Sequence, residues 1–326
     1  MNEFSRKRNS VLVTGAGGYI GRQLIEALAR DRRDLKTVVA ADVRETPPDE
    51  RLTGIDYVTA DIRSSELIDI FNRFSIDTVV HLATIVTPGR KSNREFEYSV
   101  DVLGTENVLN TCLESRVKKL IITSSGAAYG YYADNPEWLD ENDALRGNPE
   151  FAYSHHKRLV EEMLGSYRNE HPELNQLVLR PGTVLGATTS NQITALFQKT
   201  FIMGLMGADS PFVFIWDQDV VSCILKGIFG DVTGIYNLAG DGVLTMKEIA
   251  GMMDKPYVAL PVGLVRAALW MLKKLGLSQY GPEQINFLRY RPVLSNRRLK
   301  KKFGYIPQKT TREVFEYYMF HTKQRE

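Results

Sequence analysis

The sequence of 326 residues has only two cysteines, Cys112 and Cys223, and residues 1–9 are polar, without a signal-peptide hydrophobic region. Two cysteines cannot form a disulfide framework, so we expect a reducing location, the cytoplasm. The 41 basic and 39 acidic side chains nearly cancel, which gives no indication of a nucleic-acid partner. The five histidines show no metal-ligand spacing, so the sequence predicts no metal site.

Long apolar runs are also scarce. Residues 258–277 form the strongest one, but Arg266, Lys273 and Lys274 interrupt it. Charges at these positions argue against a membrane-spanning helix. We expect an amphipathic helix that covers a core or a substrate cleft, with contact to a lipid surface as the alternative.

Apolar runs and helical periodicities alternate through the first half of the chain. Apolar runs typical of buried strands occupy residues 10–14, 36–42, 56–61, 78–83, 119–124 and 176–180. Helical patterns cover residues 19–30, a segment ending at 74, 99–115 and 153–170. Such alternation predicts an α/β fold, a Rossmann-like doubly wound parallel sheet. With 43% hydrophobic residues, the chain can bury a large core.

Gly15, Gly18 and Gly21 follow the first predicted strand and open the first predicted helix. Glycines with this G-x-x-G-x-x-G spacing permit a tight turn and let the backbone approach a pyrophosphate at a helix N-terminus. The strand–turn–helix context therefore predicts a dinucleotide-binding site.

Asp42 ends the second predicted strand. A carboxylate there accepts hydrogen bonds from the adenosine ribose hydroxyls and repels a 2′-phosphate. NAD is therefore the expected cofactor, and NADP is the alternative because Arg44 could receive that phosphate. At the end of the third strand, Asp61 and Ile62 are candidates for contact with the adenine, although Asp61 could equally cap its own loop.

Beyond Pro181 the alternation weakens and the loops lengthen, although residues 211–216 and 234–239 still have the pattern of strands. We expect an NAD-binding Rossmann-like domain over residues 1–182. Residues 183–326 are expected to form a smaller, mixed substrate-binding lobe that returns some strands to the main sheet.

Tyr153 and Lys157 lie at positions i and i+4 of a predicted helix and therefore share one face. An ammonium beside a phenol makes that phenol a candidate proton donor and acceptor. Downstream of a dinucleotide-binding start, the pair indicates oxidoreductase chemistry on an alcohol or ketone.

Together these elements resemble the extended short-chain dehydrogenase/reductase family, which contains NAD-dependent nucleotide-sugar epimerases and dehydratases. The resemblance covers most of the chain. The matching segments are residues 14–21 to TGxxGxIG, 81–83 to the cofactor-lining segment, 102–105 to VxGT, 123–130 to SSxxVYG, 180–186 to RxxNxYG, and 236–240 with Thr245 and Glu248 to NxGxxxxxTxxE.

The resemblance implies a role for each matching residue. Tyr153 would be the general acid/base, Lys157 would bind the nicotinamide ribose, and Ser125 would hydrogen-bond the substrate oxygen, with Ser124 as the fallback. It also implies a homodimer formed through the helices at 99–115 and 153–170. The implied cofactor contacts are Gly15, Gly18, Tyr19, Ile20, Gly21, Asp42, Asp61, Ile62, Leu82, Ala83 and Lys157.

Three positions depart from the sugar-nucleotide pattern. Asp101 replaces the usual Asn before VxGT, Thr183 replaces an Asn that contacts the diphosphate, and Trp216 replaces the His of HVxD. Arg291, like Arg289, could still clamp a pyrophosphate because guanidinium groups fit phosphate geometry. The candidate substrate contacts are Thr87, Thr183, Trp216 and Arg291.

The leading hypothesis is an NAD-dependent oxidoreductase of the epimerase/dehydratase type. It would transfer hydride at a carbinol or ketone carbon of a small molecule such as a nucleotide sugar. Apolar residues near the expected cleft keep open a dehydrogenase or reductase of an apolar hydroxy or keto compound, of the 3β-hydroxysteroid or dihydroflavonol type. A non-catalytic dinucleotide-binding subunit on the same fold is the second alternative.

Overall fold

The computed structural model describes residues 10–86, 93–209, 211–276, 281–282 and 284–324, so Thr87 lies outside the described residues. The chain divides into two compact units. Unit 1 consists of Met1–Ser124, Leu159–Leu179 and Val220–Ile235, and unit 2 of Ser125–Arg158, Arg180–Asp219 and Tyr236–Glu326. Segments of the two units alternate along the chain, whereas the expected division at residue 182 is a single cut and stays a prediction.

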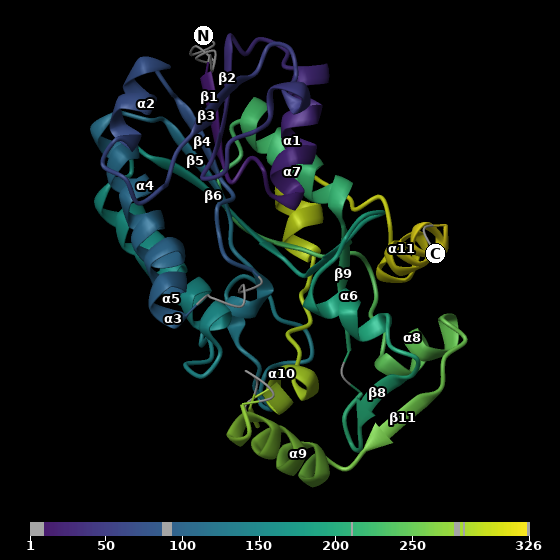
Figure 1. The fold of residues 1–326 in the computed structure, drawn as a ribbon. Helices are drawn as coiled ribbons and strands as arrows, with labels where there is room; N and C mark the ends of the chain where they lie inside the picture. Colours follow the sequence, from purple (N-terminus) through teal and green to yellow (C-terminus); the bar gives the residue numbers. More distant parts are fainter. Residues whose placement is uncertain (1–9, 87–92, 210, 277–280, 283, 325–326) are drawn as a thin grey trace. The chain divides into compact units, whose positions relative to one another are not determined.

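Seven strands form the main sheet, in the order β10-β6-β5-β4-β1-β2-β3 (Figure 1). They are β1 (Ser10–Thr14), β2 (Thr37–Asp42), β3 (Asp56–Thr59), β4 (Thr78–His81), β5 (Lys119–Thr123), β6 (Asn175–Pro181) and β10 (Gly234–Leu238). β1 pairs in parallel with β2 and β4, β2 with β3, β4 with β5, and β5 with β6. The strand order reverses between β1 and β4, where doubly wound sheets bind ligands. The Rossmann-like fold that the sequence predicts is confirmed.

Helices cover both faces of this sheet (Figure 1). One face carries α2 (Leu67–Arg73), α4 (Gly104–Glu114) and the later turns of α5 (Ala152–Glu170); the other carries α1 (Tyr19–Arg30) and α7 (Asp217–Phe229). Leu120 and Ile122 of β5 belong to the core shared with α2, α4 and α5, whereas Ile121 lies against Gly227 of α7. Burial on both faces explains why the strands are apolar runs and do not alternate.

The helix predicted over residues 99–115 begins earlier and changes its winding. The Asn93 side chain accepts a hydrogen bond from Phe96 N (2.8 Å) and so caps α3 (Arg94–Tyr98). A π-helical turn, η2 (Ser99–Leu103), then precedes α4. The prediction missed the Asn93 cap because it placed the helix start at a later serine.

Unit 2 contains two small parallel sheets. β7 (Thr183–Leu185) pairs with β9 (Phe214–Trp216), and β8 (Ile202–Leu205) pairs with β11 (Tyr257–Leu260). The strand predicted over residues 211–216 is observed only over Phe214–Trp216, and Phe212 forms an isolated bridge with Leu244.

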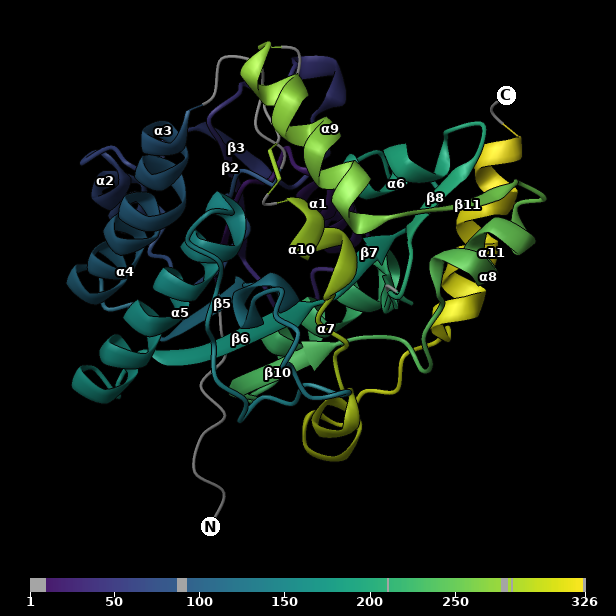
Figure 2. The ribbon, with the colours of Figure 1, turned by 90° about the horizontal axis from the view of Figure 1, so that it is seen from below.

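Three helices of unit 2 pack on an aromatic core in which the Phe197 and Phe315 ring centroids lie 5.3 Å apart: α6 (Gln192–Phe197), α8 (Met246–Met252) and α11 (Thr311–Lys323). Two further helices, α9 (Val262–Lys274) and α10 (Gln284–Arg289), pack on a separate small core with Leu205 of β8 (Figures 1 and 2). Thr245 and Glu248 form a capping box that begins α8, so this late sequence motif has a structural role. Within the described ranges, every helix is too short or too polar to cross a bilayer.

Lys119, the first residue of β5, is fully buried, and its Nζ donates to the carbonyl oxygens of Gly227 (2.6 Å) and Gly230 (3.0 Å) at the end of α7. We expect Lys119→Met to lower the free energy of unfolding by about 2–4 kcal/mol, because the buried carbonyl of Gly227 and the partly buried carbonyl of Gly230 lose this donor. Urea denaturation measures the change. The exposed neighbour Lys118 is the matched control, and Lys118→Met should change stability by less than about 0.5 kcal/mol. Equal losses in both variants would contradict the capping role.

Candidate functional site

The turn after β1 contains glycines at positions where a side chain would clash with neighbouring backbone atoms. Gly15 has φ +69°, and a Cβ there would lie 2.6 Å from Ala83 N on the loop after β4. A Cβ on Gly21 would collide with Gly15 O and lie 2.8 Å from Ala16 Cα. Gly18 N donates to Gly15 O (3.0 Å) and closes the turn. The backbone is therefore bare at the carboxyl end of β1, as close approach of a ligand requires.

The N-terminus of α1 is suited to an anion. Its N-cap, Gly18, makes no side-chain cap, and no acidic residue lies in the first turn. The positive end of the helix dipole at this terminus favours a negatively charged ligand. Tyr19 and Ile20, the first two residues of α1, are half-buried there. This cradle fits the pyrophosphate of a dinucleotide.

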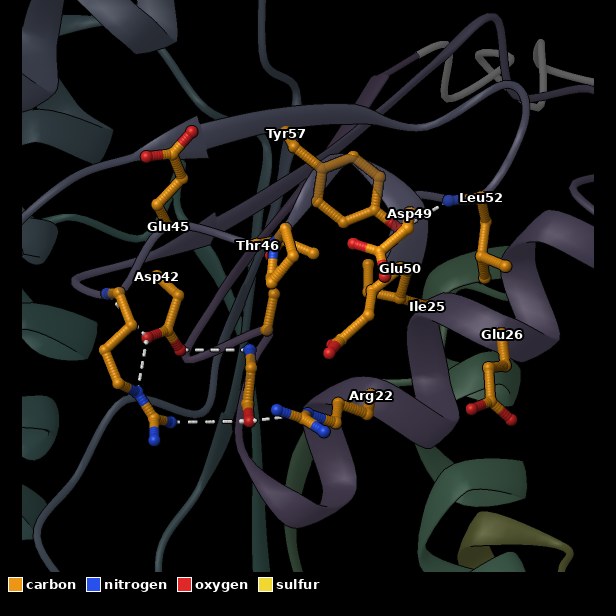
Figure 3. Close-up of a pocket in the computed structure, with 14 residues that line it drawn as sticks. Arg22, Ile25, Glu26, Asp42, Glu45, Thr46, Asp49, Glu50, Leu52 and Tyr57 are labelled. Atoms are coloured by element: carbon orange, nitrogen blue, oxygen red, sulfur yellow. Dashed lines mark hydrogen bonds and ion pairs between the residues drawn. The ribbon is translucent and has the colours of Figure 1, made fainter.

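Asp42 is buried at the end of β2 and is held from two sides. Its Oδ2 accepts from Gly17 N (2.9 Å), and its Oδ1 accepts from Arg44 N (3.0 Å). Arg22 Nε (3.0 Å) and Arg44 Nη2 (3.4 Å) both donate to Gly17 O (Figure 3). Sequence reasoning missed Arg22, whose only local signal is its place in the first turn after the glycines.

A cavity of about 520 Å³ opens beside Asp42 within unit 1. Arg22, Ile25 and Glu26 of α1 line one side, and the segment from Arg44 to Leu52 lines the other (Figure 3). Two guanidinium groups thus lie near the carboxylate that we expect to contact the adenosine ribose.

Asp61 and Ile62 follow β3, as predicted, but Asp61 already has a partner. Its Oδ1 accepts from Arg63 N (2.9 Å), and its Oδ2 accepts from Arg63 Nη2 (2.6 Å). The Arg63 hydrogen bonds lower the pKa of this carboxyl. Ile62 is buried against Gly104, where a Cβ would lie 2.6 Å from Ile62 Cδ1. That contact explains the glycine of the VxGT motif.

A chain of hydrogen bonds supports the segment after β4, which includes Leu82 and Ala83. Thr14 Oγ1 lies 2.7 Å from His81 Nδ1, and His81 Nε2 lies 3.1 Å from Thr105 Oγ1. Thr105 Oγ1 donates to Asp101 O (2.6 Å), so His81 Nε2 donates to Thr105 and Nδ1 accepts from Thr14. The ends of β1 and β4 are thereby locked to the π-helical turn.

Asp101, which departs from the family pattern, holds the loop after β4 in place. Its Oδ1 accepts from Thr84 Oγ1 (2.8 Å) and from Ile85 N (2.8 Å). Both bonds end on the same oxygen, so the carbonyl oxygen of an Asn could accept them as well. The part played by Thr84 is another contact that sequence reasoning missed.

Unit 2 brings together Ser125, Tyr153 and Lys157. Lys157 is buried, and its Nζ lies 5.6 Å from the centroid of the half-buried Tyr153 ring, as the i, i+4 spacing predicts. Ser125 Oγ accepts from Ala127 N (3.1 Å) and caps the turn η3 (Gly126–Tyr129). This bond uses a lone pair of the hydroxyl and leaves its proton for another acceptor.

Ser154 ties the Ser125 turn to the helix that carries Tyr153. Its Oγ donates to Ala127 O (2.7 Å) and accepts from Asn148 N (3.1 Å). Ser125 and Tyr153 are thus held by one rigid connection within unit 2. In the sequence, the only sign of these Ser154 hydrogen bonds is a serine in the first turn of a predicted helix. Ser124, the fallback for Ser125, has a buried hydroxyl without a hydrogen-bond partner among the described residues.

Tyr129, Arg180 and Asn237 come from three of the family-like segments and form a buried polar frame. Arg180 Nη1 donates to the Tyr129 hydroxyl (2.8 Å), which lies 2.9 Å from Asn237 Oδ1. Burial raises the pKa of Tyr129 to about 12. Tyr129 therefore stays protonated and structural, in contrast to the role predicted for Tyr153.

The three described candidates for substrate contact have different surroundings. Thr183 N donates to Val213 O (3.1 Å). The Trp216 ring packs edge-on against Tyr317, with centroids 5.6 Å apart. The Arg291 guanidinium lies 3.9 Å from the Phe212 ring centroid, and its Nη1 is buried without a hydrogen-bond partner in the described part of the chain. Arg289 instead lies over its neighbour Tyr290.

Similarity to known proteins extends over most of the chain. The profile of the NAD dependent epimerase/dehydratase family matches residues 11–214. The UDP-glucose 4-epimerase of Yersinia pestis is 32% identical over 290 residues, which cover 79% of this chain and 79% of that protein.

Two solved structures share the fold. MoeE5 in complex with UDP-glucuronic acid and NAD has a TM-score of 0.73 at 21% identity, covering 98% of this chain and 100% of that one. The dTDP-glucose 4,6-dehydratase of Bacillus anthracis strain Ames, in complex with NAD, has a TM-score of 0.74 at 15% identity, covering 98% and 97%. Because the family profile covers more than half of the sequence, this chain belongs to the NAD dependent epimerase/dehydratase family, and NAD is its cofactor.

Proposed function

We propose that the protein is an NAD-dependent oxidoreductase acting on a carbinol carbon of a nucleotide sugar, in a reaction of the epimerase or dehydratase type. The observation that carries the proposal is the arrangement in unit 2. There Tyr153 and Lys157 share a helix face, and Ser154 ties that helix to the Ser125 turn. A nucleotide-sugar substrate is supported by the UDP-glucose 4-epimerase relative and by the UDP-glucuronic acid bound to MoeE5.

Unit 1 offers the groups that would hold the cofactor. The glycine turn would face the pyrophosphate, and Asp42 would accept hydrogen bonds from the adenosine ribose. When bound, NAD supplies a hydride acceptor and donor at C4 of its nicotinamide. Further proposed contacts of unit 1 are Tyr19, Ile20, Asp61, Ile62, Leu82 and Ala83, and Lys157 is the proposed contact from unit 2.

The proposed chemistry of the chain itself is proton transfer. Tyr153 as the phenolate takes the proton of the substrate hydroxyl and becomes a phenol, which later returns that proton. The ammonium of Lys157 near the ring stabilises the phenolate form. Ser125 donates its hydroxyl proton to the substrate oxygen and orients it. These groups serve an epimerase, a dehydratase and a simple dehydrogenase alike, because each reaction begins by oxidising a carbinol.

Arg291 is the proposed contact of the diphosphate. Burial lowers the pKa of its guanidinium to about 10, which still leaves the group charged at neutral pH. Its Nη1, which has no hydrogen-bond partner among the described residues, would gain an acceptor from a phosphate oxygen. The rings of Phe212 and Phe287, 3.9 Å and 4.7 Å from the guanidinium, orient the group.

An apolar hydroxy or keto compound is the second candidate substrate. Trp216 stands where the sugar-nucleotide pattern has a histidine, and it presents an aromatic surface with Tyr317. Thr183 likewise replaces an amide that would contact a diphosphate.

A ligand screen distinguishes the two candidates. The NAD-loaded protein is mixed with UDP-glucose, UDP-glucuronic acid and dTDP-glucose, and separately with steroid-like and aromatic ketones. We expect a rise in Tm with at least one nucleotide sugar, since a ligand at a concentration of 100 times its Kd stabilises the folded state by about 2.7 kcal/mol. Product analysis and absorbance at 340 nm then identify the reaction. A response to an apolar ketone alone would reverse the ranking.

The preference for NAD is expected to depend on Asp42. We expect Asp42→Asn to lower the preference for NAD over NADP about 10- to 100-fold, because the like-charge repulsion of the 2′-phosphate disappears while Arg22 and Arg44 remain. Isothermal titration with both cofactors measures the ratio. Glu45→Gln, the same charge change in the same cavity, should leave the ratio unchanged. Tighter binding of NADP than of NAD by the wild type would contradict the role of Asp42.

A homodimer formed through α4 and α5 stays a prediction, and light scattering checks it. A reducing, cytoplasmic location also stays a prediction. Cys112 and Cys223 are both buried free thiols, which is compatible with it.

A further inference from the structure

Helix α9 presents three different sides. Val265 is buried and packs in a small core with Leu205 and Ile285, and Val262 and Leu269 pack against the same core. This seam attaches α9 to unit 2 beside α10 (Figures 1 and 2). It uses only one side of the helix, and the other two sides face solvent.

The second side is apolar and exposed. Leu264, Met271 and Leu275 are 59%, 55% and 63% exposed, and Ala267 and Ala268 are also exposed. Spacings of three and four residues place these five side chains in one stripe along the helix. Isolated apolar residues are ordinary on a protein surface, but a continuous stripe marks an interaction site.

The third side is basic. Arg266, Lys273 and Lys274 are exposed on it, together with Trp270, which is 55% exposed. The Lys274 Nζ lies 5.0 Å from the Trp270 ring centroid. Residues 255–276 contain no Asp or Glu, so the charged side chains of α9 itself are all basic.

We propose that α9 binds the surface of an anionic lipid bilayer and lies parallel to it. The stripe of Leu264, Met271 and Leu275 would enter the boundary between headgroups and acyl chains. Lys274 lies beside the stripe and would extend to lipid phosphates, and Trp270 would lie at the interface. Arg266 and Lys273, farther round the helix, would add to its positive field. Such contact needs no spanning helix and is reversible, because it combines a modest apolar area with attraction to negative lipids.

A second copy of the chain fits this surface poorly. α9 has 13 residues, so its stripe is about 20 Å long and, at a width of roughly 10 Å, offers about 200 Å², against about 800 Å² per partner in a stable interface. A two-fold interface also places the same patch on both partners. The basic side chains of α9 would then lie near those of the second copy, which is unfavourable. A negative lipid surface complements both the stripe and the charge.

Vesicle co-sedimentation of the full chain tests the proposal. We expect the protein to pellet with phosphatidylcholine vesicles that contain phosphatidylglycerol, to stay in the supernatant with phosphatidylcholine alone, and to be released by high salt. Lys273→Glu with Lys274→Glu should weaken the binding about tenfold or more. The charge-matched control is Lys301→Glu with Lys302→Glu, on the exposed basic turn η4 (Leu299–Phe303), and it should bind like the wild type.

The stripe is tested separately. Leu264→Gln, Met271→Gln and Leu275→Gln combined should abolish pelleting with unchanged Tm and NAD affinity. The control changes two other exposed apolar residues, Ile306→Gln and Phe320→Gln, which are 73% and 60% exposed, and should leave pelleting intact. Three results would overturn the proposal: no pelleting of the wild type at low salt, equal effects of the variants and their controls, or conversion of a dimer to a monomer by the stripe variant. The outcome is independent of the substrate, because no turnover is measured.

Discussion

Tyr153→Phe is expected to lower turnover of the substrate by about 10²- to 10⁴-fold, the usual contribution of a positioned acid/base. The substitution removes only the phenolic oxygen from a half-buried ring near Lys157 Nζ. Packing of the ring and the binding of NAD should persist, since the phenyl ring, Lys157 and the glycine turn of unit 1 are all unchanged. The measurement is turnover at saturating substrate, together with NAD affinity by titration.

Tyr167→Phe is the matched control for this prediction, because it removes a phenolic oxygen from the same helix. The Tyr167 hydroxyl donates to Asn110 Oδ1 (2.6 Å) at the surface of unit 1. Its loss should cost at most about 1 kcal/mol of stability and leave turnover unchanged. Full activity of Tyr153→Phe would instead indicate another acid/base or a non-catalytic dinucleotide-binding protein.

Gly21→Ala is expected to weaken NAD binding about 100-fold or more and to lower stability by about 1–3 kcal/mol. The new Cβ would collide with Gly15 O and lie 2.8 Å from Ala16 Cα, both backbone atoms of the glycine turn. The turn and α1 must then move apart, which displaces the N–H groups that would face the pyrophosphate. Calorimetric titration with NAD and thermal denaturation measure the two effects.

Gly165→Ala is the control for the second prediction. Gly165 lies in α5, and a Cβ there meets nothing within 4 Å. Alanine at a free helical position should raise stability by about 0.5–1 kcal/mol and leave NAD affinity unchanged. Wild-type NAD affinity of Gly21→Ala would show that close packing of this turn is not what holds the cofactor.

The elements that could be predicted are those whose signal is local. The first strand, the glycine turn and the first helix have the predicted bounds, Ser10–Thr14 and Tyr19–Arg30. The pairing of Tyr153 with Lys157 follows from helical spacing alone. The π-helical turn at Ser99–Leu103 was missed because no residue pattern distinguishes it from an ordinary helix.

The contacts that could not be predicted join residues far apart in the chain. Gly17 donates to Asp42, Thr14 pairs with His81, and Ser154 donates to Ala127. Each pair depends on which strand ends and turns become neighbours after folding. Sequence reasoning could name Asp42 and His81 but could not supply their partners.

Helix α9 shows most clearly the difference between what local sequence determines and what tertiary contacts decide. The sequence predicts an amphipathic, basic helix over residues 258–277, because periodicity and charge are local properties. The helix forms over Val262–Lys274, whereas Val258–Leu260 belong to β11, which pairs with β8. Which apolar residues lie covered was decided only by the tertiary structure: Val265 is 6% exposed and Leu264, its neighbour, 59%. The physical reason is that an apolar side chain has the same periodicity whether a core covers it or not. Burial depends on segments such as β8 and α10, which reach the helix only through folding.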